Sequence, residues 1–177
     1  MGRMLSNFKE GLIYLIPKLH NASHEIRQWR PITIFNLIYK FFANILVQRV
    51  KPFLGDIIQT NQTGFMEHQS IMDNVILFWE AVAMAGETRQ NLACLMLDFE
   101  KAYDQVQWSF LEEVMKVIEL PREWRCAAHA LYRNGSSKVL IAGRKGARIS
   151  LSRSIRQGCP LTPFLFLLSS SLHGCFI

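Results

Sequence analysis

The stretch NLACLMLDFEKAYD, residues 91–104, decides the predicted fold. Its apolar run, residues 92–97, has no polar alternation, which is typical of a strand buried on both faces. The run ends at Asp98, and Tyr103 and a second carboxylate, Asp104, follow after a mixed segment. Because an unpaired carboxylate at the edge of a core is costly, Asp98 is expected to face a wet cleft or to bind a cation. A strand-end aspartate that caps the next turn is the alternative, and this stretch alone leaves it open.

Length and charge set broad limits on the protein. The 177 residues, half of them hydrophobic, suffice for one sizeable core or two small subdomains. Twenty Lys and Arg against 14 Asp and Glu give a net charge of +6, which suits a polyanionic partner without being specific for one.

The spacing of the cysteines and the composition of the two ends of the sequence indicate in which cellular compartment the protein is expected. Without any CxxC spacing, the cysteines predict free thiols in a reducing compartment rather than a metal ribbon or a disulfide framework. The polar, charged start does not resemble a secretory signal, and residues 163–177 are too short and serine-rich for a bilayer span of ~20 apolar residues. We therefore expect an intracellular protein, in the nucleus or the cytoplasm.

Local patterns predict an α+β fold without autonomous domains or a strict βαβ repeat. The expected strands are those at 11–17 and 92–97 and a hairpin of 138–142 and 148–151 around residues 143–146. Two helices are expected in the first half of the chain: one from about 36 that Pro52 stops, and one that a Ser70–Asp73 capping box opens and Gly86 ends. Three more are expected in the second half: one that Ser109 caps and that runs through about 118, one from Pro121 to Asn134-Gly135, and one from Thr162-Pro163. The expected core faces of the first two helices are Ile38, Phe41, Phe42, Ile45, Leu46, Val50 and Ile71, Val75, Phe78, Trp79, Val82, Ala83.

Two clusters could carry chemistry. Asp98, with the backbone carbonyl of Phe99, suits Mg²⁺, which takes few protein carboxylates and leaves room for phosphate oxygens. Two-metal nucleotidyl transfer needs more than one carboxylate. Asp104 is the further candidate, although Asp104 and Gln107 equally resemble a local cap.

The second cluster is RQGCPLTP, residues 156–163. Gly158 would allow the backbone to approach a ligand closely, and Gln157 offers a donor and an acceptor to a base or sugar edge. An ordinary loop before a helix that Thr162 caps is the alternative.

The order of motifs resembles the reverse transcriptases of LINE-type (non-LTR) retrotransposons, especially those of plants. The matching blocks are LIPK at 15–18, WRPI at 29–32 with Asn36 and Tyr39-Lys40, QTGF at 62–65 through SIMDN at 70–74, LDFEKAYD at 97–104 with Val106 and Trp108, and RQGCPLTP at 156–163. The similarity extends from about residue 10 to about residue 168.

This resemblance implies a right-hand polymerase with fingers at about 10–90 and a partial palm at about 91–177, without a thumb. It implies an RNA-directed DNA polymerase that uses an RNA template, a DNA primer, deoxynucleoside triphosphates and Mg²⁺.

The resemblance also implies residue roles. Asp98 would bind the catalytic Mg²⁺ with help from the Phe99 carbonyl, and Tyr103 would lie under the sugar of the incoming nucleotide. Gln157 and Gly158 would pack against that nucleotide and the template.

Cationic side chains would meet phosphates. Arg30, Lys18 and Lys40 would contact the triphosphate or the nucleic-acid backbone, where cations supply sequence-independent affinity. The last hairpin region is also basic, and it suits either a nucleic-acid face or a solvated edge; its residues are Arg144, Lys145, Arg148, Arg153 and Arg156.

Two departures from the family pattern affect activity. Gln69 stands where the family usually has Arg, and the aromatic-Ala-Asp-Asp hairpin that carries the other metal carboxylates is missing from the sequence. Residues 169–177 resemble a premature or frameshifted end. We therefore expect a reverse transcriptase fragment that is inactive alone. A non-catalytic nucleic-acid-binding remnant and the product of a decayed reading frame are the alternatives.

Overall fold

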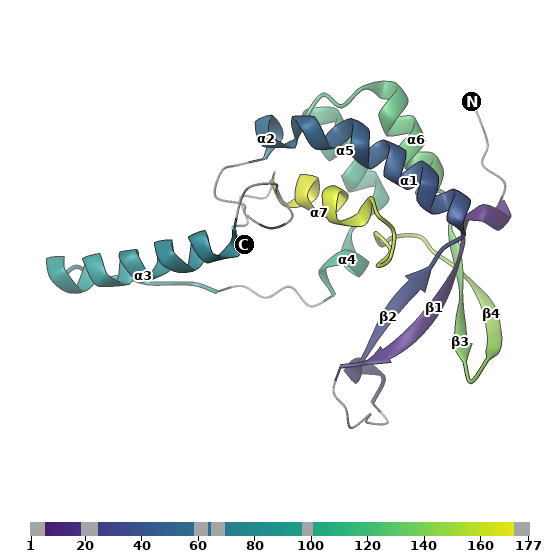
Figure 1. The fold of residues 1–177 in the computed structure, drawn as a ribbon, viewed down its shortest axis with the longest axis horizontal. Coiled ribbons are helices and arrows are strands. Elements are labelled where there is room, and N and C mark those ends of the chain that lie inside the picture. The colour runs from purple at the N-terminus through teal and green to yellow at the C-terminus, as the bar shows by residue number, and fades with distance from the viewer. Residues whose placement is uncertain (1–5, 19–24, 59–63, 65–69, 97–100, 172–177) are drawn as a thin grey trace.

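The architecture of the protein was established from a computed structural model. It describes residues 6–18, 25–58, 64, 70–96 and 101–171. Figure 1 shows a helical body above a small twisted sheet, with one long helix extending away from both. The arrangement confirms the predicted α+β class.

The four-stranded sheet has the order β2-β1-β3-β4. Its strands are β1 (Glu10–Pro17), β2 (Trp29–Ile34), β3 (Ser136–Ile141) and β4 (Arg144–Ser150). β1 pairs antiparallel with β2 and parallel with β3, and β3 pairs antiparallel with β4. The predicted first strand and hairpin are confirmed, and the sheet joins strands from both the expected fingers and the expected palm.

Two details of the sheet differ from the sequence prediction. β2 was not expected to be a strand, and its Pro31 is tolerated because β2 lies at an edge of the sheet. The hairpin turn consists of Ala142 and Gly143, both with positive φ (47° and 77°), rather than residues 143–146. Two residues with positive φ form the turn whose twist matches that of the flanking strands, so β4 begins directly at Arg144.

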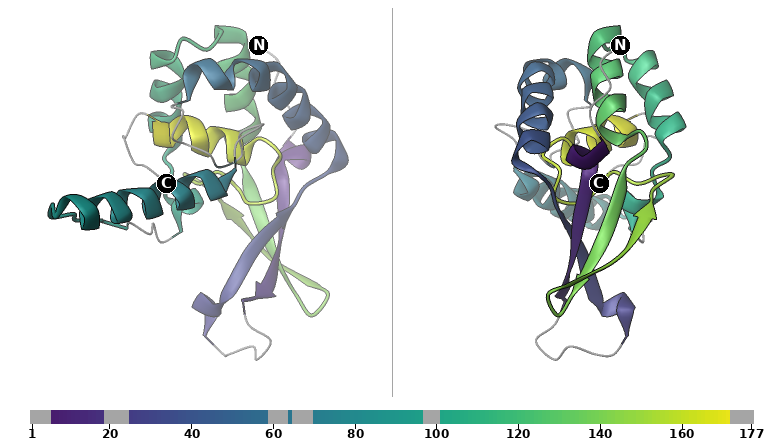
Figure 2. Two further views of the ribbon diagram at one scale, coloured as in Figure 1. Left: turned by 60° about the vertical axis from the view of Figure 1, so that its left-hand side comes forward. Right: turned by 90° about the vertical axis from the view of Figure 1, so that its right-hand side faces the viewer.

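The helical body packs around one hydrophobic core (Figure 2). Its helices are α1 (Leu37–Val50), α2 (Leu54–Ile57), α5 (Trp108–Val117), α6 (Arg122–Tyr132) and α7 (Thr162–Ser171), with α4 (Ala102–Gln105) beside them. Three short 3₁₀ turns complete the described elements: Ser6–Lys9, Ile26–Gln28 and Lys51–Phe53. Leu165 and Leu168 of α7 are fully buried, so this helix lies at the centre of the core.

The start of α1 agrees with the sequence prediction, whereas the predicted cap of α5 is wrong. The predicted start of α1 at about residue 36 is confirmed, and the Asn36 side chain caps the helix by accepting a hydrogen bond from the backbone N–H of Ile38 at 2.9 Å. The Ser109 cap is wrong, because α5 begins at Trp108 after an N-cap residue, Gln107, whose side chain makes no capping hydrogen bond.

The core face of α1 is rotated from the predicted one. Its buried residues are Tyr39, Ala43, Leu46, Val47 and Val50, whereas the predicted Ile38, Phe41 and Phe42 are exposed. Because α1 is apolar around most of its circumference, periodicity alone does not select a face. The stacking of Tyr39 on Phe35, with ring centroids 4.3 Å apart, fixes it instead.

The long helix α3 (Ile71–Thr88) extends away from the body (Figures 1 and 2). Its predicted capping box is present: Ser70 Oγ accepts from Met72 N–H, and Asp73 Oδ2 accepts from Ser70 N–H at 3.1 Å. The predicted buried face is wrong, because no residue of α3 is buried. The helix also continues two residues past Gly86 and ends at a left-handed Arg89.

The predicted doubly buried strand is wrong over residues 92–96. These residues have no regular secondary structure, and Leu95 and Met96 are 83% and 86% exposed. A strand buried on both faces needs neighbouring strands, and the four described strands pair only among themselves. The apolar composition of the run favours a buried strand, but it does not provide the neighbouring strands with which such a strand must pair.

No described helix combines the length and the apolarity needed to cross a bilayer.

Candidate functional site

The strongest sequence candidate, Asp98, lies outside the described residues, together with Phe99. The same holds for most of the QTGF block and for Gln69. The described part of the site therefore consists of the end of the first palm motif and the whole second motif.

These two motifs are tied together by backbone hydrogen bonds. The N–H of Ile155 donates to the carbonyl of Tyr103, and the N–H of Ser154 donates to the carbonyl of Val106, both at 2.9 Å. The indole N–H of Trp108 donates to the carbonyl of Ser154, also at 2.9 Å. The segment after the first motif thus holds the loop that leads into the second.

Tyr103 is fixed from the other side by α7. Its ring lies 4.8 Å from that of Phe166, centroid to centroid, at an interplanar angle of 58°. The partly buried ring packs against the hydrophobic core. Its expected role under a nucleotide sugar stays a prediction.

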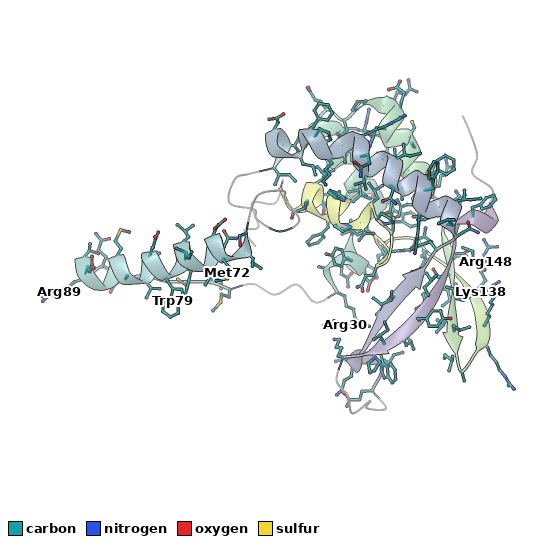
Figure 3. The ribbon with its side chains drawn as sticks, in the orientation of Figure 1. Arg30, Met72, Trp79, Arg89, Lys138 and Arg148 are labelled. Carbon is teal, nitrogen blue, oxygen red and sulfur yellow. The ribbon has the colours of Figure 1, made fainter. Side chains whose placement is uncertain are left out.

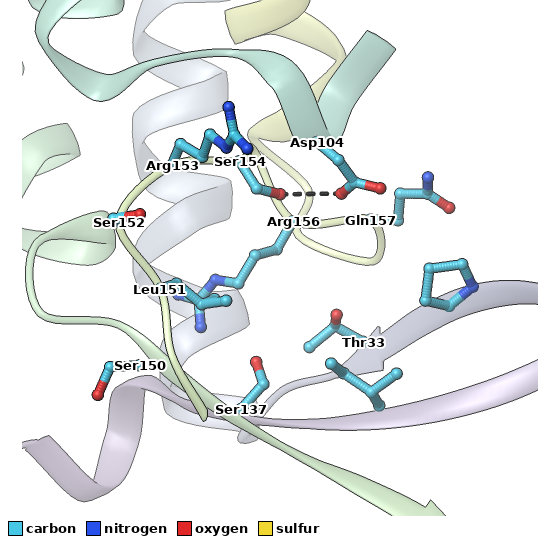
Figure 4. Close-up of a pocket in the computed structure, with 12 residues that line it drawn as sticks. Thr33, Asp104, Ser137, Ser150, Leu151, Ser152, Arg153, Ser154, Arg156 and Gln157 are labelled. Carbon is cyan, nitrogen blue, oxygen red and sulfur yellow. Dashed lines mark hydrogen bonds between the residues drawn. The ribbon is translucent and has the colours of Figure 1, made fainter. Parts of the chain in front are cut away.

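Asp104 lines a pocket between the sheet and the loop of residues 150–157 (Figure 4). Its Oδ1 accepts a hydrogen bond from the Ser154 hydroxyl at 3.0 Å. This contact, rather than a local cap with Gln107, is the hydrogen bond that the structure gives its carboxylate.

The Gln157-Gly158 turn is docked on β2. The N–H of Thr33 donates to the carbonyl of Gln157 at 2.9 Å. Gly158 has φ of +104°, and a Cβ atom at this position would overlap the carbonyl oxygen of Thr33. Glycine is therefore required here because the backbone approaches a strand of its own chain, whereas the sequence prediction was a close approach to a ligand.

Arg156, weakly predicted to contact nucleic acid, is buried rather than exposed on a surface. Its side chain is 3% exposed, and its guanidinium carbon lies 4.5 Å from the centroid of the Phe35 ring. Nη1 donates to the carbonyl of Lys9 at 2.8 Å, and Nη2 donates to the Tyr39 hydroxyl at 3.2 Å and to the carbonyl of Leu131 at 3.3 Å. These contacts occupy both terminal nitrogens of the guanidinium, whereas Nε has no hydrogen-bond partner.

A buried polar cluster around Arg156 was not predicted. The hydroxyls of Tyr39 and Tyr132 both donate to Cys159 Sγ, at 3.6 and 3.4 Å. Burial raises the pKa of both tyrosine hydroxyls, and the nearby thiol adds to the shift. The Thr162 hydroxyl donates to the carbonyl of Arg156 at 2.7 Å, so the cluster fixes the whole turn before α7. No local sequence signal marks such a cluster, because its members lie far apart in the chain.

The other predicted cations do not converge on the Gln157 turn. Arg30 is exposed and pairs with Ile16, so strand alternation directs its side chain to the sheet face opposite Thr33. Lys18 is exposed at the end of β1, and Lys40 is half-buried on α1.

Basic side chains gather on the β3–β4 side of the sheet, where Figure 3 labels the half-buried Lys138 and the exposed Arg148. Lys138 forms an ion pair with Glu10 at 2.8 Å, and Arg148 Nε donates to Ser136 Oγ at 2.9 Å. Arg144 and Lys145, the first two residues of β4, are exposed, which fits either a nucleic-acid face or a solvated edge.

The described residues do not by themselves gather three or more His, Cys, Asp or Glu side chains into a metal-binding group. A metal site in this part of the chain would thus depend on Asp98, which lies outside the described residues.

Comparison with known proteins places the chain in a family. Residues 16–170 match the family described as reverse transcriptase (RNA-dependent DNA polymerase). The chain is 29% identical to the transposon TX1 uncharacterized 149 kDa protein of Xenopus laevis over 98% of the chain and 14% of that protein. It is 27% identical to the Pol polyprotein of the type-1 retrotransposable element R2 of Nasonia vitripennis over 93% of the chain and 16% of that protein.

A solved structure has a similar fold. An apo telomerase from Candida tropicalis, truncated from the C-terminal domain, superposes with a TM-score of 0.60 over 96% of this chain and 40% of that chain, at 14% identity. The relatives confirm the resemblance to retrotransposon enzymes that the motifs indicated. On the match that covers most of its length, the chain belongs to the reverse transcriptase (RNA-dependent DNA polymerase) family.

Proposed function

We propose that these residues form the fingers and part of the palm of an RNA-directed DNA polymerase from a non-LTR retrotransposon, and that they do not extend a primer alone. The chain spans 14% and 16% of the length of two retrotransposon relatives. The observation that carries the proposal is the docking of the Gln157-Gly158 turn between β2 and the Tyr103 segment. That packing joins three blocks of the family pattern in one place.

In this proposal Asp98 and the Phe99 carbonyl hold Mg²⁺. A bound Mg²⁺ supplies Lewis-acid activation and neutralises charge on transferring phosphates. Tyr103 supports the nucleotide sugar, and Gln157 contacts the nucleotide or the template. Arg30 supplies positive charge from the exposed face of β2.

Catalysis by these residues alone is not expected. Two-metal transfer needs further carboxylates, and the sequence contains no aromatic-Ala-Asp-Asp motif. Asp104, the remaining candidate, already accepts the Ser154 hydroxyl.

Nucleic-acid binding without catalysis is the second candidate function, and the exposed basic side chains of β4 favour it. With a net charge of +6, the chain is expected to bind RNA or primed template with an affinity that falls steeply with salt. Such a partner implies a protein that acts in the nucleus or the cytoplasm.

Primer extension and binding test both candidates. The purified 177-residue chain is incubated with Mg²⁺, a primed RNA template and deoxynucleotides, beside Asp98→Ala. We expect no extension by either protein and equal, salt-sensitive binding by both. Robust extension that Asp98→Ala abolishes would overturn the proposed inactivity, and salt-independent or absent binding would remove the second candidate.

A further inference from the structure

We propose that the pocket between the sheet and the loop of residues 150–157 binds a phosphate-sized oxyanion. This sheet–loop pocket has a volume of about 340 Å³, and its lining includes Thr33, Ser137, Arg153, Arg156 and Gln157. One water molecule takes up ~30 Å³ in the liquid, so the pocket has room for a larger guest. Gln157 of the proposed nucleotide site also lines this pocket, but the inference rests on Arg156 and Ser137, to which the proposed polymerase function gives no role.

The first reason is a buried positive charge without a counter-ion. Arg156 is almost fully buried, and within the described residues no carboxylate forms an ion pair with it. Lys9, 9% exposed, is also cationic, and its Nζ donates to the carbonyl of Arg133 at 2.9 Å. Burial, and then the charges of Arg156 and Arg133, lower the pKa of Lys9. A buried charge that carbonyls and rings alone surround is unfavourable, and an anion would offset it.

The second reason is a pair of unsatisfied donors. Arg156 Nε and Ser137 Oγ are buried and have no hydrogen-bond partner. Both residues line the pocket, and Figure 4 shows the Arg156 side chain crossing it and the Ser137 hydroxyl pointing into it. Both groups can donate, and an oxyanion offers several acceptor oxygens at once.

The remaining lining is compatible with a small anion. The exposed guanidinium of Arg153 and the amide of Gln157 add donors, and the lining also includes Ser150 at the end of β4 and Ser152 in the loop. Asp104 is the carboxylate of the lining, and one of its oxygens is occupied by Ser154. Two guanidinium groups against one carboxylate leave the lining net positive.

An ordered water could satisfy the two free donors but would leave the charge of Arg156 uncompensated. A phosphoryl group would accept hydrogen bonds from both donors and would also compensate the charge of Arg156. The group could come from free phosphate or pyrophosphate, or from the terminal phosphate of a nucleic acid.

The test uses the 177-residue chain and inorganic phosphate. Isothermal titration is run at constant ionic strength, and thermal unfolding is followed in phosphate against chloride. We expect saturable binding and a melting temperature that rises with phosphate, because a ligand bound only by the folded state stabilises it. Ser137→Ala should weaken binding about tenfold or more, the usual effect of removing a hydrogen bond to a charged group.

Ser136→Ala is the matched control. Ser136 lies next to Ser137 on β3, is equally buried and points to the opposite face, where its hydroxyl accepts from Arg148. This variant should bind phosphate like the parent chain. The serine variants keep the test possible even where a substitution of Arg156 prevents folding.

Competition identifies the source of the phosphoryl group. An oligonucleotide with a 5′-phosphate that displaces phosphate, while its 5′-hydroxyl counterpart does not, assigns the site to nucleic-acid ends; no displacement by either assigns it to free phosphate. No saturable phosphate binding, or equal binding by Ser137→Ala and the parent chain, would overturn the proposal and leave water as the guest.

Discussion

Substitution of Gly158 by alanine tests the docking of the second motif on β2. A residue other than glycine at φ of +104° is strained, by ~1–3 kcal/mol for sparsely populated conformations. The new methyl group would also overlap the carbonyl oxygen of Thr33, so the turn must move away from the strand. That movement breaks the hydrogen bond from Thr33 N–H to Gln157, which contributes ~0.5–1.5 kcal/mol.

The two effects together predict that Gly158→Ala lowers the free energy of unfolding by about 2–4 kcal/mol. For a chain of this size, the melting temperature should fall by about 5–15 °C. Urea denaturation gives the free energy, and amide hydrogen exchange at Thr33 reports whether the turn has left the strand.

Gly86→Ala is the matched control. Gly86 lies inside α3, and an added Cβ there would meet no atom within 4 Å. Alanine should therefore stabilise the helix by ~0.5–1 kcal/mol. A Gly158→Ala chain with unchanged stability and an unchanged exchange rate at Thr33 would refute the docking of the turn.

Three further predictions concern the core, a cap and the buried hydroxyls. Leu165→Ala should lower the free energy of unfolding by ~2–5 kcal/mol in urea, whereas Leu95→Ala should change it by less than ~0.5 kcal/mol; equal losses would contradict the described burial. Asn36→Ala removes the cap of α1 and should lower the same quantity by ~0.5–2 kcal/mol, an effect that Asn36→Asp should largely avoid. Burial raises the pKa of Tyr39, so near pH ~10 the unfolded chain releases the hydroxyl proton while the folded chain keeps it. The free energy of unfolding should therefore be constant below that pH and fall above it, by up to ~1.4 kcal/mol per pH unit. Urea midpoints between pH 9 and 11 should show a shallower fall for Tyr39→Phe, and an identical slope would argue against the raised pKa.

Elements with a local signal were the ones that the sequence predicted well. The predicted capping box of Ser70 and Asp73 is a short-range contact, and α3 begins directly after Ser70. The run at 92–97 failed because its burial depends on other strands, which no pattern within the run can guarantee.

Arg156 shows the same limit for the candidate site. A basic residue in a polar loop is usually exposed, but here rings and carbonyls from three distant segments surround it. The family match could be predicted because motif order is a property of the sequence. The pocket could not, because it exists only where the sheet meets the loop of residues 150–157.

The parallel pairing of β1 with β3 has a consequence for biosynthesis. Glu10 pairs with Ser136 in the finished sheet, so β1 leaves the ribosome well before its partner strand β3. At ~5–20 residues per second that interval lasts several seconds, during which the β1–β2 hairpin presents an unpaired apolar edge. A chaperone could bind this exposed edge during synthesis. The yield of folded protein should therefore rise when chaperones are co-expressed, although the folded chain has a well-packed core.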